Sequence, residues 1–493
     1  MTAAPTWSDE HYRALFDPRG VIVAGASSHP GKFGFVALHN LLACGYQGRV
    51  FATNLEGTPV LGVDTVATIE EIPAGQADLV FVCTPAKTNL DLLRSCAAIG
   101  VKAAFIASAG YGEAGEEGKA AQDELVRVAA ELGVLVAGPN GQGVVSTPSS
   151  MCAQIVAPMP PPGHIGVASQ SGNFVSTFEN LAQHYGVGLS RAISAGNAAA
   201  VGVADYLEFY ANDPETSVGL AYVEGLVDGR TFLERLRRVS EQMPVVLVKG
   251  GASDVGARAA ASHTGSLATD DRVFDGACRQ AGVVRAATIE EAYDAAATFA
   301  TQPLPKGPRV AVVSTAGGWG VVTADAISRA GSLELLPLPA DLRTALDAVL
   351  PPRWSRNNPI DMAGGETKDT VPTVLEIAAS HPDVDAVVFL GMGIQGNTAR
   401  MEREGRFYPE HGLERIVGYH ERQDRRFTAV AAELSASLGK PILTATELAI
   451  CDRDNPAVAG CRDAGVLCYA SANRAVTALA HLWRHAKWRL ARG

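Results

Sequence analysis

One histidine of the chain stands in a context that suits chemistry. His263 lies in a stretch of small residues, from Gly256 to Ser266, just before Thr269-Asp270-Asp271, a pattern typical of a helix N-terminus. An unprotonated imidazole is a competent nucleophile near neutral pH, and a loop rich in glycine and alanine suits a side chain that must reach two places. Several other histidines fall within helical patterns, where a structural role is the default. His263 is therefore a candidate functional residue.

A second candidate site begins where the first apolar run, residues 21–26, ends. The run continues into a loop and then a helical pattern, and the loop contains Gly25, Ser27, Gly31 and Lys32. Glycines let backbone amides approach a phosphate, and a helix N-terminus adds partial positive charge. Lys32 is a candidate phosphate partner, and a solvated lysine in a turn is an equally good interpretation.

Three later loops follow predicted strands in the same way. They contain Pro85 and Lys87, Ser108 and Gly110, and Asn140. Because ligands collect beyond the carboxyl ends of parallel strands, these loops and the first one together predict a nucleotide-like site, although each alone could be an ordinary turn. The glycine spacing does not match G-x-G-x-x-G, and the second predicted strand carries no acidic residue, which disfavours ordinary NAD binding.

Short β-branched apolar runs alternate with helical patterns along the whole chain, which predicts an α/β protein with doubly wound parallel sheets. Pro-rich segments at residues 157–163 and 302–308 divide it into three predicted domains: 1–150, 151–303 and 304–493. The predicted strands are residues 21–26, 49–53, 78–83, 103–107, 134–137, 165–168, 190–194, 218–223, 245–249, 283–285, 309–314, 386–390 and 441–444. The predicted helices include residues 88–98, 117–132, 174–185, 289–301 and 473–490.

Composition narrows the class of protein. A length of 493 residues favours about three domains, and a net charge of −11 argues against a nucleic-acid partner. The eight cysteines form no C-x-x-C pair and are expected to be reduced, and we predict no metal site. With no apolar leader and no run of 18 apolar residues, we expect a cytoplasmic protein without membrane contact.

The order of the four loops resembles the CoA-binding domain of the NDP-forming acyl-CoA synthetases, relatives of succinyl-CoA synthetase. Over its whole length the chain is similar to the α subunit of the ADP-forming acetyl-CoA synthetases, and the His263 segment is the most specific part. The other segments that carry the resemblance are residues 166–173, 194–197, 222–225, 316–318 and 358–361.

This resemblance implies a Rossmann-like CoA-binding domain followed by two flavodoxin-like domains. It implies that phosphate attacks a thioester to give an acyl phosphate and CoA, and that the phosphoryl group passes to His263 and then to a nucleotide. Glu224 would orient the imidazole, unless it is only a solvated carboxylate at a strand end. The helix N-terminus at Ser171, Gly172 and Asn173 would hold the phosphoryl group, which is compatible with ordinary capping.

The sequence departs from the family pattern at several points. Gly141-Gln142 replaces Cys-Leu, Leu55-Glu56 replaces Pro-Lys, and Trp319 replaces the proline of Gly-Pro-Gly. Glu56 removes a cation near the place where the adenosine end of CoA would lie. The Arg-rich stretch 396–426 differs from the shorter family segment, and it is interpreted as a solvated face or, alternatively, a subunit contact.

All three domains are assigned, so none remains for an ATP-grasp nucleotide domain, which needs on the order of 200 residues. We therefore expect a separate ATP-grasp β subunit that holds ATP or ADP and Mg²⁺, while this chain binds CoA. The family resemblance implies an α2β2 assembly. The second substrate is a small carboxylic acid that the sequence does not identify. A CoA-sensing regulatory or scaffold protein with the same fold and no turnover is the alternative.

Overall fold

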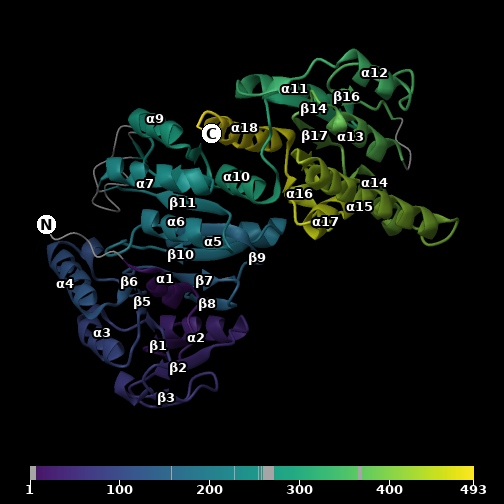
Figure 1. The fold of residues 1–493 in the computed structure, drawn as a ribbon. Helices are drawn as coiled ribbons and strands as arrows, with labels where there is room; N and C mark the ends of the chain where they lie inside the picture. Colours follow the sequence, from purple (N-terminus) through teal and green to yellow (C-terminus); the bar gives the residue numbers. More distant parts are fainter. Residues whose placement is uncertain are drawn as a thin grey trace. The chain divides into compact units, whose positions relative to one another are not determined.

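The computed structural model describes residues 7–156, 158–226, 228–253, 255–256, 258, 271–364 and 369–492. It contains three β-sheets with flanking helices, drawn in Figure 1. Two compact units are present: residues up to 183 with 188–289, and residues 184–187 with 290–493. The first two sheets lie in the first unit and the third lies in the second, so the predicted α/β class is confirmed.

The first sheet is parallel throughout. Its elements are α1 (Asp9–Phe16), β1 (Gly20–Ala24), α2 (Phe33–Ala43), β2 (Arg49–Thr53), β3 (Thr65–Val66), β4 (Leu79–Val82), α3 (Asn89–Ala98), β5 (Ala103–Ile106), α4 (Glu116–Leu132) and β6 (Leu135–Ala137). The strand order is β3-β2-β1-β4-β5-β6, so the order reverses between β1 and β4. Helices cover both faces of such a sheet, and accordingly every residue of β1 and β4 is buried.

The second sheet has the order β13-β12-β11-β9-β10-β7-β8. Strands β9 to β13 are parallel, whereas β7 and β8 form an antiparallel hairpin that continues the sheet and was not predicted. The predicted boundary at residue 150 falls in the turn of this hairpin. The elements are β7 (Gly143–Ser146), β8 (Met151–Gln154), β9 (Pro162–Ser169), α5 (Gly172–Tyr185), β10 (Leu189–Ser194), α6 (Val203–Asn212), β11 (Val218–Val223), α7 (Gly229–Gln242), β12 (Val245–Lys249), α9 (Asp271–Ala281) and β13 (Val284–Ala286).

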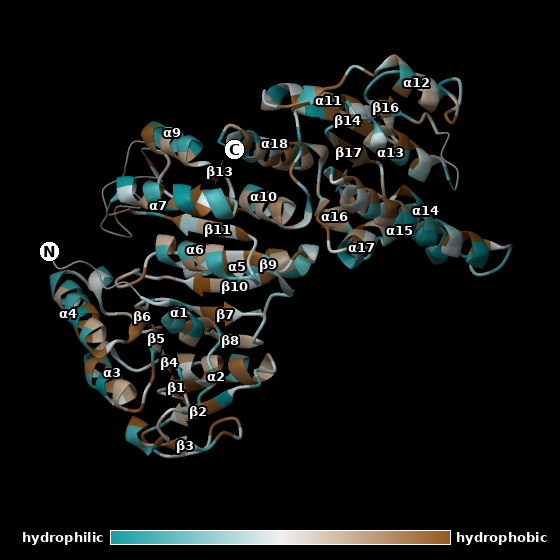
Figure 2. Cartoon of the chain, in the orientation of Figure 1, coloured by the Kyte–Doolittle hydropathy of each residue, from teal (hydrophilic) through white to brown (hydrophobic). Residues whose placement is uncertain are grey.

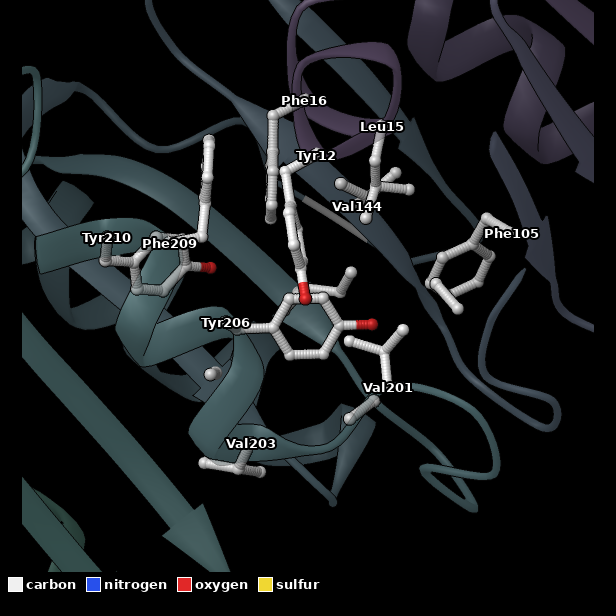
Figure 3. Close-up of a cluster of buried hydrophobic side chains, with 14 of the residues drawn as sticks. Tyr12, Leu15, Phe16, Phe105, Val144, Val201, Val203, Tyr206, Phe209 and Tyr210 are labelled. Atoms are coloured by element: carbon white, nitrogen blue, oxygen red, sulfur yellow. The ribbon is translucent and has the colours of Figure 1, made fainter. Parts of the chain in front are cut away.

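Helix α1 joins the cores of the first two sheets. Its residues Tyr12 and Phe16 pack against Tyr206, Phe209 and Tyr210 of α6, and Leu15 belongs to the same buried cluster, as Figure 3 shows. The ring of Phe209 stacks on Phe16 and on Tyr12, with centroids 5.4 and 5.1 Å apart. Shared aromatic burial of this kind explains why the two sheets form one compact unit.

The third sheet has the order β15-β14-β17-β18-β19, with β16 paired to β14, and all its strands are parallel. The second unit consists mainly of α10 (Ile289–Thr301), β14 (Arg309–Ser314), α11 (Gly317–Ala330), β15 (Glu334–Leu335), α12 (Ala340–Asp347), β16 (Ile360–Asp361), α13 (Thr370–Ser380), β17 (Ala386–Leu390), α14 (Ile394–Glu404), α15 (Leu413–Leu438), β18 (Ile442–Ala445), α16 (Leu448–Cys451), α17 (Pro456–Asp463), β19 (Cys468–Tyr469) and α18 (Ala472–Leu490).

Figure 2 shows that the strands are mostly hydrophobic, whereas outer helices such as α7 and α15 carry long hydrophilic stretches. No helix among the described residues combines the length and the apolar composition needed to cross a bilayer.

Most predicted strands are present within one or two residues of their predicted bounds, and β11, β12, β14 and β17 match them. Strand β9 starts earlier than predicted, at Pro162, inside the Pro-rich segment. Proline is tolerated there because it occupies the first position of the strand. Helix α1 is too short and too polar to stand out in the sequence, and its packing alone reveals its role.

Candidate functional site

The loop after β1 brings a helix N-terminus against the end of a strand. Gly25 has φ +83°, and a β-carbon on Gly34 would lie 2.0 Å from the carbonyl oxygen of Gly25. Only glycine at position 34 therefore allows α2 to start this close to β1. Gly31 and Lys32 are exposed, and no side chain caps α2, whose N-cap residue is Lys32. The first turn of α2 thus lies at the carboxyl edge of the sheet, and its role as an anion site stays a prediction.

Asn89, which the sequence analysis did not single out, holds the two neighbouring loops together. The buried Nδ2 of Asn89 donates to Ser108 Oγ at 3.0 Å and to the hydroxyl of Tyr111 at 2.9 Å. Its Oδ1 accepts a hydrogen bond from Thr84 Oγ1 at 2.9 Å. Its position next to Pro85 and Lys87, at the start of α3, was the available signal, but an asparagine there also suits ordinary helix capping.

The candidate residues of these loops lie at one edge. Lys87 is exposed in a 3-10 turn, Ala86–Thr88, that directly precedes α3. The amide of Asn140 donates to the carbonyl oxygen of Ser108 at 3.2 Å, which joins the loops after β5 and β6. The amide of Gly110 donates to Glu113 Oε1 at 2.6 Å, so in this state that amide is already occupied. The structure therefore brings the predicted loops together at the carboxyl edge of the first sheet.

At the corresponding edge of the second sheet, a serine at the strand end fixes the turn into α5. Ser169 Oγ accepts from the amide of Ser171 at 3.1 Å and donates to the carbonyl oxygen of Ser171 at 2.7 Å. Helix α5 then begins at Gly172, with Asn173 exposed in its first turn. The predicted phosphate-binding residues therefore do lie at a helix N-terminus next to a parallel strand end.

Glu224 follows β11 at this same edge. Its amide donates to Gln170 Oε1 at 2.6 Å, and its carboxylate accepts from the hydroxyl of Tyr222 at 3.1 Å. A β-carbon on Gly250 would lie 3.2 Å from Glu224 Cγ, so the chain leaving β12 passes close to this carboxylate. His263 follows along that chain and lies outside the described residues, so the predicted contact between His263 and Glu224 stays a prediction.

The edges of the two sheets meet through the loops at residues 138–142 and 195–199. The amide of Asn197 donates to the carbonyl oxygen of Pro139 at 2.9 Å, and the amide of Ala199 donates to that of Gly138 at 3.1 Å. A β-carbon on Gly196 would lie 2.2 Å from the carbonyl oxygen of Pro139. The backbones are thus in direct contact, and glycine permits the close approach.

Gln142 connects the two candidate binding sites across this junction. Its Nε2 donates to Asn173 Oδ1 at 3.1 Å, and a β-carbon on Gly172 would lie 2.3 Å from Gln142 Cδ. Its Oε1 is buried and has no hydrogen-bond partner among the described residues. Asn140 of the first edge and Asn173 of the second are therefore linked through a single short loop. No three histidine, cysteine, aspartate or glutamate side chains gather into a metal site in the described part of the chain.

Three family models match successive parts of the chain. Residues 19–147 match the CoA binding domain, residues 162–299 the succinyl-CoA ligase like flavodoxin domain, and residues 310–395 the ligase-CoA domain. The α subunit of the ADP-forming acetate–CoA ligase I of Pyrococcus furiosus is 33% identical over 480 residues, which cover 97% of this chain and 98% of that protein. The chain belongs to the family of ADP-forming acyl-CoA synthetases.

Two further relatives agree with this assignment. The ADP-forming acetate–CoA ligase I of Archaeoglobus fulgidus is 36% identical over 374 residues, 76% of this chain and 54% of that protein. A solved structure, the dinucleotide forming acetyl-coenzyme A synthetase 1 of Ca. Korarchaeum cryptofilum in complex with phosphate and ADP, matches with a TM-score of 0.82 at 28% identity, over 98% of both chains. The predicted family is confirmed, and the chain is an acid–thiol ligase that acts on CoA.

The third sheet of this acyl-CoA synthetase repeats the turn found after β9. Ser314 Oγ accepts from the amide of Ala316 at 3.0 Å and donates to the carbonyl oxygen of Ala316 at 2.7 Å, and α11 begins at the next residue, Gly317. The side chain of Asn358 holds the neighbouring loop against β14. Its Oδ1 accepts a hydrogen bond from the amide of Val312 at 2.9 Å, and its Nδ2 donates to the carbonyl oxygen of Val310 at 2.8 Å. Two segments that carried the family resemblance thus both adjoin β14.

The Arg-rich stretch folds as the helical hairpin of α14 and α15. Its arginines form ion pairs, including Arg403 with Glu421 at 2.9 Å and Arg400 with Asp452 at 3.2 Å. Most of these side chains are partly exposed, and exposed pairs contribute little to stability. This arrangement fits the interpretation as a solvated face.

Proposed function

We propose that the chain is the α subunit of an NDP-forming acyl-CoA synthetase that catalyses acid + CoA + ATP = acyl-CoA + ADP + phosphate. The observation that carries the proposal is the direct contact between the two carboxyl edges, through residues 138–142 and 195–199. A thioester formed from CoA at the first edge needs a phosphoryl group close by. The helix N-terminus that begins at Gly172 lies at that junction.

CoA binds at the first edge in this proposal. The amides at the start of α2 and the exposed side chains of Lys32 and Lys87 receive its phosphates. Ser27 and Ser108 offer hydroxyl groups, and Asn140 lies where this edge meets the second sheet. The remaining residues of the proposed CoA site let the backbone approach the ligand or shape the turns: Gly25, Gly31, Pro85 and Gly110.

The phosphoryl group moves in three balanced steps. Phosphate attacks the thioester carbonyl carbon, the C–S bond breaks, and an acyl phosphate and CoA are formed. A ring nitrogen of His263 attacks the phosphorus, which releases the carboxylate, and the phosphohistidine then transfers its phosphoryl group to ADP. Glu224 accepts a hydrogen bond from the other ring nitrogen, which sets the tautomer, while Ser171, Gly172 and Asn173 hold the phosphoryl oxygens.

A partner chain supplies the nucleotide site. The match with the longer Archaeoglobus fulgidus ligase covers 54% of that protein. We infer a separate ATP-grasp β subunit that holds ATP or ADP with Mg²⁺, in an α2β2 assembly. Within the α chain we assign residues 1–150 to the CoA-binding domain, 151–303 to the domain that carries the phosphohistidine, and 304–493 to the second flavodoxin-like domain.

The proposal is tested by incubating the chain and its β subunit with ATP labelled at the γ-phosphate. We expect label on the α chain that is stable to base, labile to acid and absent from the variant His263→Asn. The variant Glu224→Gln should form the phosphoenzyme more slowly by roughly 10²- to 10⁴-fold, a typical effect of losing a group that assists proton positioning.

The alternative of a CoA-sensing protein predicts a different result. Such a protein would bind CoA, detected by calorimetry, but the complete complex would carry no label and would form no acyl-CoA. Unchanged labelling in His263→Asn would instead show that the phosphoryl group is held elsewhere.

A further inference from the structure

Two cysteines that lie far apart in the sequence come together where α2 packs against β8. Cys44 is the C-cap residue of α2, and Cys152 is the second residue of β8. Asn40, one helical turn before Cys44, donates from Nδ2 to the carbonyl oxygens of Gln154 at 2.9 Å and Val156 at 3.0 Å. One turn of α2 beyond Asn40 and two residues of β8 before Gln154 each cover about 6 Å, so this packing brings the two cysteines side by side.

The two thiols interact with each other. The thiol of Cys152 donates a hydrogen bond to Cys44 Sγ, which lowers the pKa of Cys44 and raises the pKa of Cys152. Both are free cysteines; Cys44 is half-buried, so that solutes reach it, whereas Cys152 is 1% exposed. Cys44 therefore supplies a thiolate near the surface, and Cys152 supplies a protonated thiol directly behind it. Cysteines that sense oxidants are commonly arranged in this way, next to a resolving cysteine.

A buried carboxyl group borders the pair. Gln154, two residues after Cys152 in β8, donates from Nε2 to Glu179 Oε2 at 3.4 Å. Burial raises the pKa of Glu179 to about 8, and the negative charge of Cys44 contributes to the shift, so this carboxyl group lies near the thiolate. Below that pH the carboxyl group is mostly neutral and does not oppose a charge on Cys44. A thiolate at Cys44 is therefore compatible with its surroundings at neutral pH.

Three other cysteines serve as comparisons. Cys461 and Cys468 also share a hydrogen bond, but both are buried, and Cys461 Sγ contacts Thr444 Oγ1 at 3.3 Å. Cys451 is exposed, and its Sγ donates to the carbonyl oxygen of Glu447 at 3.6 Å. Because small oxidants reach Cys451 but not the buried pair, these residues separate the effect of exposure from that of pairing.

We propose that Cys44 and Cys152 are an oxidation site, at which a peroxide joins α2 to β8 through an intramolecular disulfide. Cys44 Sγ attacks one oxygen of hydrogen peroxide, the O–O bond breaks, and the hydroxide that leaves takes up the proton lost by Cys44 to become water. Cys152 Sγ then attacks the sulfur of the sulfenic acid at Cys44, the S–O bond breaks, and the hydroxyl group leaves with the Cys152 proton as a second water. Two thiols and one peroxide thus give one disulfide and two waters, and two electrons pass from sulfur to oxygen.

The disulfide protects Cys44 without entering the proposed CoA site. Cys44 lies at the opposite end of α2 from Lys32, so the bond forms away from the groups proposed to bind the phosphates. A thiol reductant restores both cysteines from the disulfide, whereas further oxidation of a sulfenic acid to the sulfinic acid is irreversible. The oxidation site therefore goes beyond the proposed function and does not depend on the phosphoryl relay.

The first experiment treats the full, reduced chain with hydrogen peroxide near neutral pH, blocks the remaining thiols with iodoacetamide and identifies the products by peptide mass spectrometry. We expect a pair of peptides joined through Cys44 and Cys152, lighter by two hydrogen atoms, which dithiothreitol separates. Cys451→Ser, which removes an exposed thiol elsewhere, is the matched control and should give the same yield of the disulfide. His263→Asn should also give the same yield, so failure of the relay and failure of this proposal are distinguishable.

Variants of the pair test the two roles. In Cys152→Ala, peroxide should carry Cys44 on to the sulfinic acid at least about fivefold more often than in the unmodified chain, because the resolving thiol is missing. In Cys44→Ser, the buried Cys152 should stay reduced. Because Cys152 is buried, Cys152→Ser is prepared as well, and the comparison uses the variant whose midpoint of thermal unfolding stays closer to that of the unmodified chain. Oxidation of Cys451 while Cys44 and Cys152 both remain thiols would overturn the proposal, as would equal amounts of sulfinic acid with and without Cys152.

Phenylarsine oxide, which bridges two neighbouring thiols, tests the pairing without oxidation. The unmodified chain should bind it, and binding should weaken at least about tenfold in Cys44→Ser and in Cys152→Ala, since each leaves a single thiol. Cys451→Ser should bind it as the unmodified chain does. Binding that persists after the loss of either cysteine would show that the reagent is held by other thiols, and it would count against the pair.

Discussion

A carboxyl group that takes no part in the proposed reaction is buried within α5. Glu179 is fully buried; Gln154 Nε2 donates to its Oε2 at 3.4 Å, and its Oε1 has no partner among the described residues. Burial raises the pKa of Glu179 to about 8, because a charged carboxylate is poorly solvated there. The neutral acid is therefore the form that the fold accommodates.

This pKa makes stability depend on pH in a defined direction. Between the unfolded pKa near 4.3 and the folded pKa of about 8, the folded state binds more protons, so the free energy of unfolding falls as pH rises, by at most roughly 1.4 kcal/mol per pH unit. Glu179→Gln should remove this slope, raising stability at pH 8 relative to pH 5. Urea unfolding at several pH values measures it, with the exposed Glu117→Gln as control. Parallel pH profiles for Glu179→Gln and the unmodified chain would contradict the assignment.

We expect the proposed CoA site to depend on Asn89. Asn89→Ala removes the partner of three hydroxyl groups, those of Thr84, Ser108 and Tyr111. We expect it to cost about 1–3 kcal/mol of stability and to weaken CoA binding, because Ser108 loses its anchor. Calorimetric titration with CoA and denaturant unfolding together check this. Unchanged CoA affinity would show that the loop holds its conformation without Asn89.

At the scale of elements, the close approach of α2 to β1 depends on a glycine. Gly34→Ala would place a methyl group 2.0 Å from the carbonyl oxygen of Gly25, so α2 must shift away from the loop that presents its amides. We expect CoA affinity to fall at least tenfold, whereas Gly229→Ala at the start of α7, where a β-carbon meets no atom within 4 Å, should be neutral. Titration with CoA measures both, and equal affinities for the two variants would count against the proposed CoA edge.

A buried ion-pair network attaches α1 to the second sheet. Arg191 is 1% exposed, and its Nε donates to Asp213 at 3.0 Å. The guanidinium also forms an ion pair with Asp17 and donates a hydrogen bond to Ser146 Oγ. Burial alone would raise the pKa of Asp213, but the hydrogen bonds and charge of Arg191 outweigh it, and the pKa is lowered. This contribution to stability is therefore present above the unfolded pKa near 3.9 and is lost as the pH falls through the folded pKa.

Removing the guanidinium of Arg191 would leave the buried carboxylate of Asp213 without its main cation. Arg191→Met should destabilise the protein by about 3–5 kcal/mol at pH 7, because Asp213 keeps its burial and loses its main cation. The double variant Arg191→Met, Asp213→Leu should recover a large part of that loss. Arg230→Ala, at an exposed pair with Glu234, is the control and should change the free energy of unfolding by less than about 1 kcal/mol.

At the scale of the whole molecule, a chain of negative net charge must bind an anionic ligand through local positive groups, such as helix N-termini and individual lysines. The net charge is −11, so the overall field opposes CoA, and we propose that the attraction comes from the α2 N-terminus and the exposed Lys32 and Lys87. Lys32→Ala and Lys87→Ala should each weaken CoA binding about fivefold, corresponding to about 1 kcal/mol per exposed pair. Lys119→Ala on the outside of α4 serves as the control, and an equal effect of all three variants would indicate only the general field.

Much of this architecture follows from local sequence. The β-branched runs of β11, β12 and β14 are long enough and apolar enough to be assigned before any tertiary contact is considered. Because parallel strands end at one edge, the chemistry-bearing loops after them are predictable as a group. Gly25, Lys32 and Lys87 were identified for the same reason, whereas the His263 segment stood out through its small residues and the family resemblance, and Gly172 through that resemblance.

What the residues could not reveal depends on contacts between distant segments. The hairpin of β7 and β8 extends the second sheet because β7 pairs with β10, a strand that lies more than 40 residues further along the chain. Asn89 and Gln142 became significant only when loops far apart in the chain met, since an amide side chain has no defined role until its partners are placed. Local propensity and pattern therefore determined the elements and the edges where ligands collect, whereas the joining of the two edges arose from packing, which depends on the whole fold.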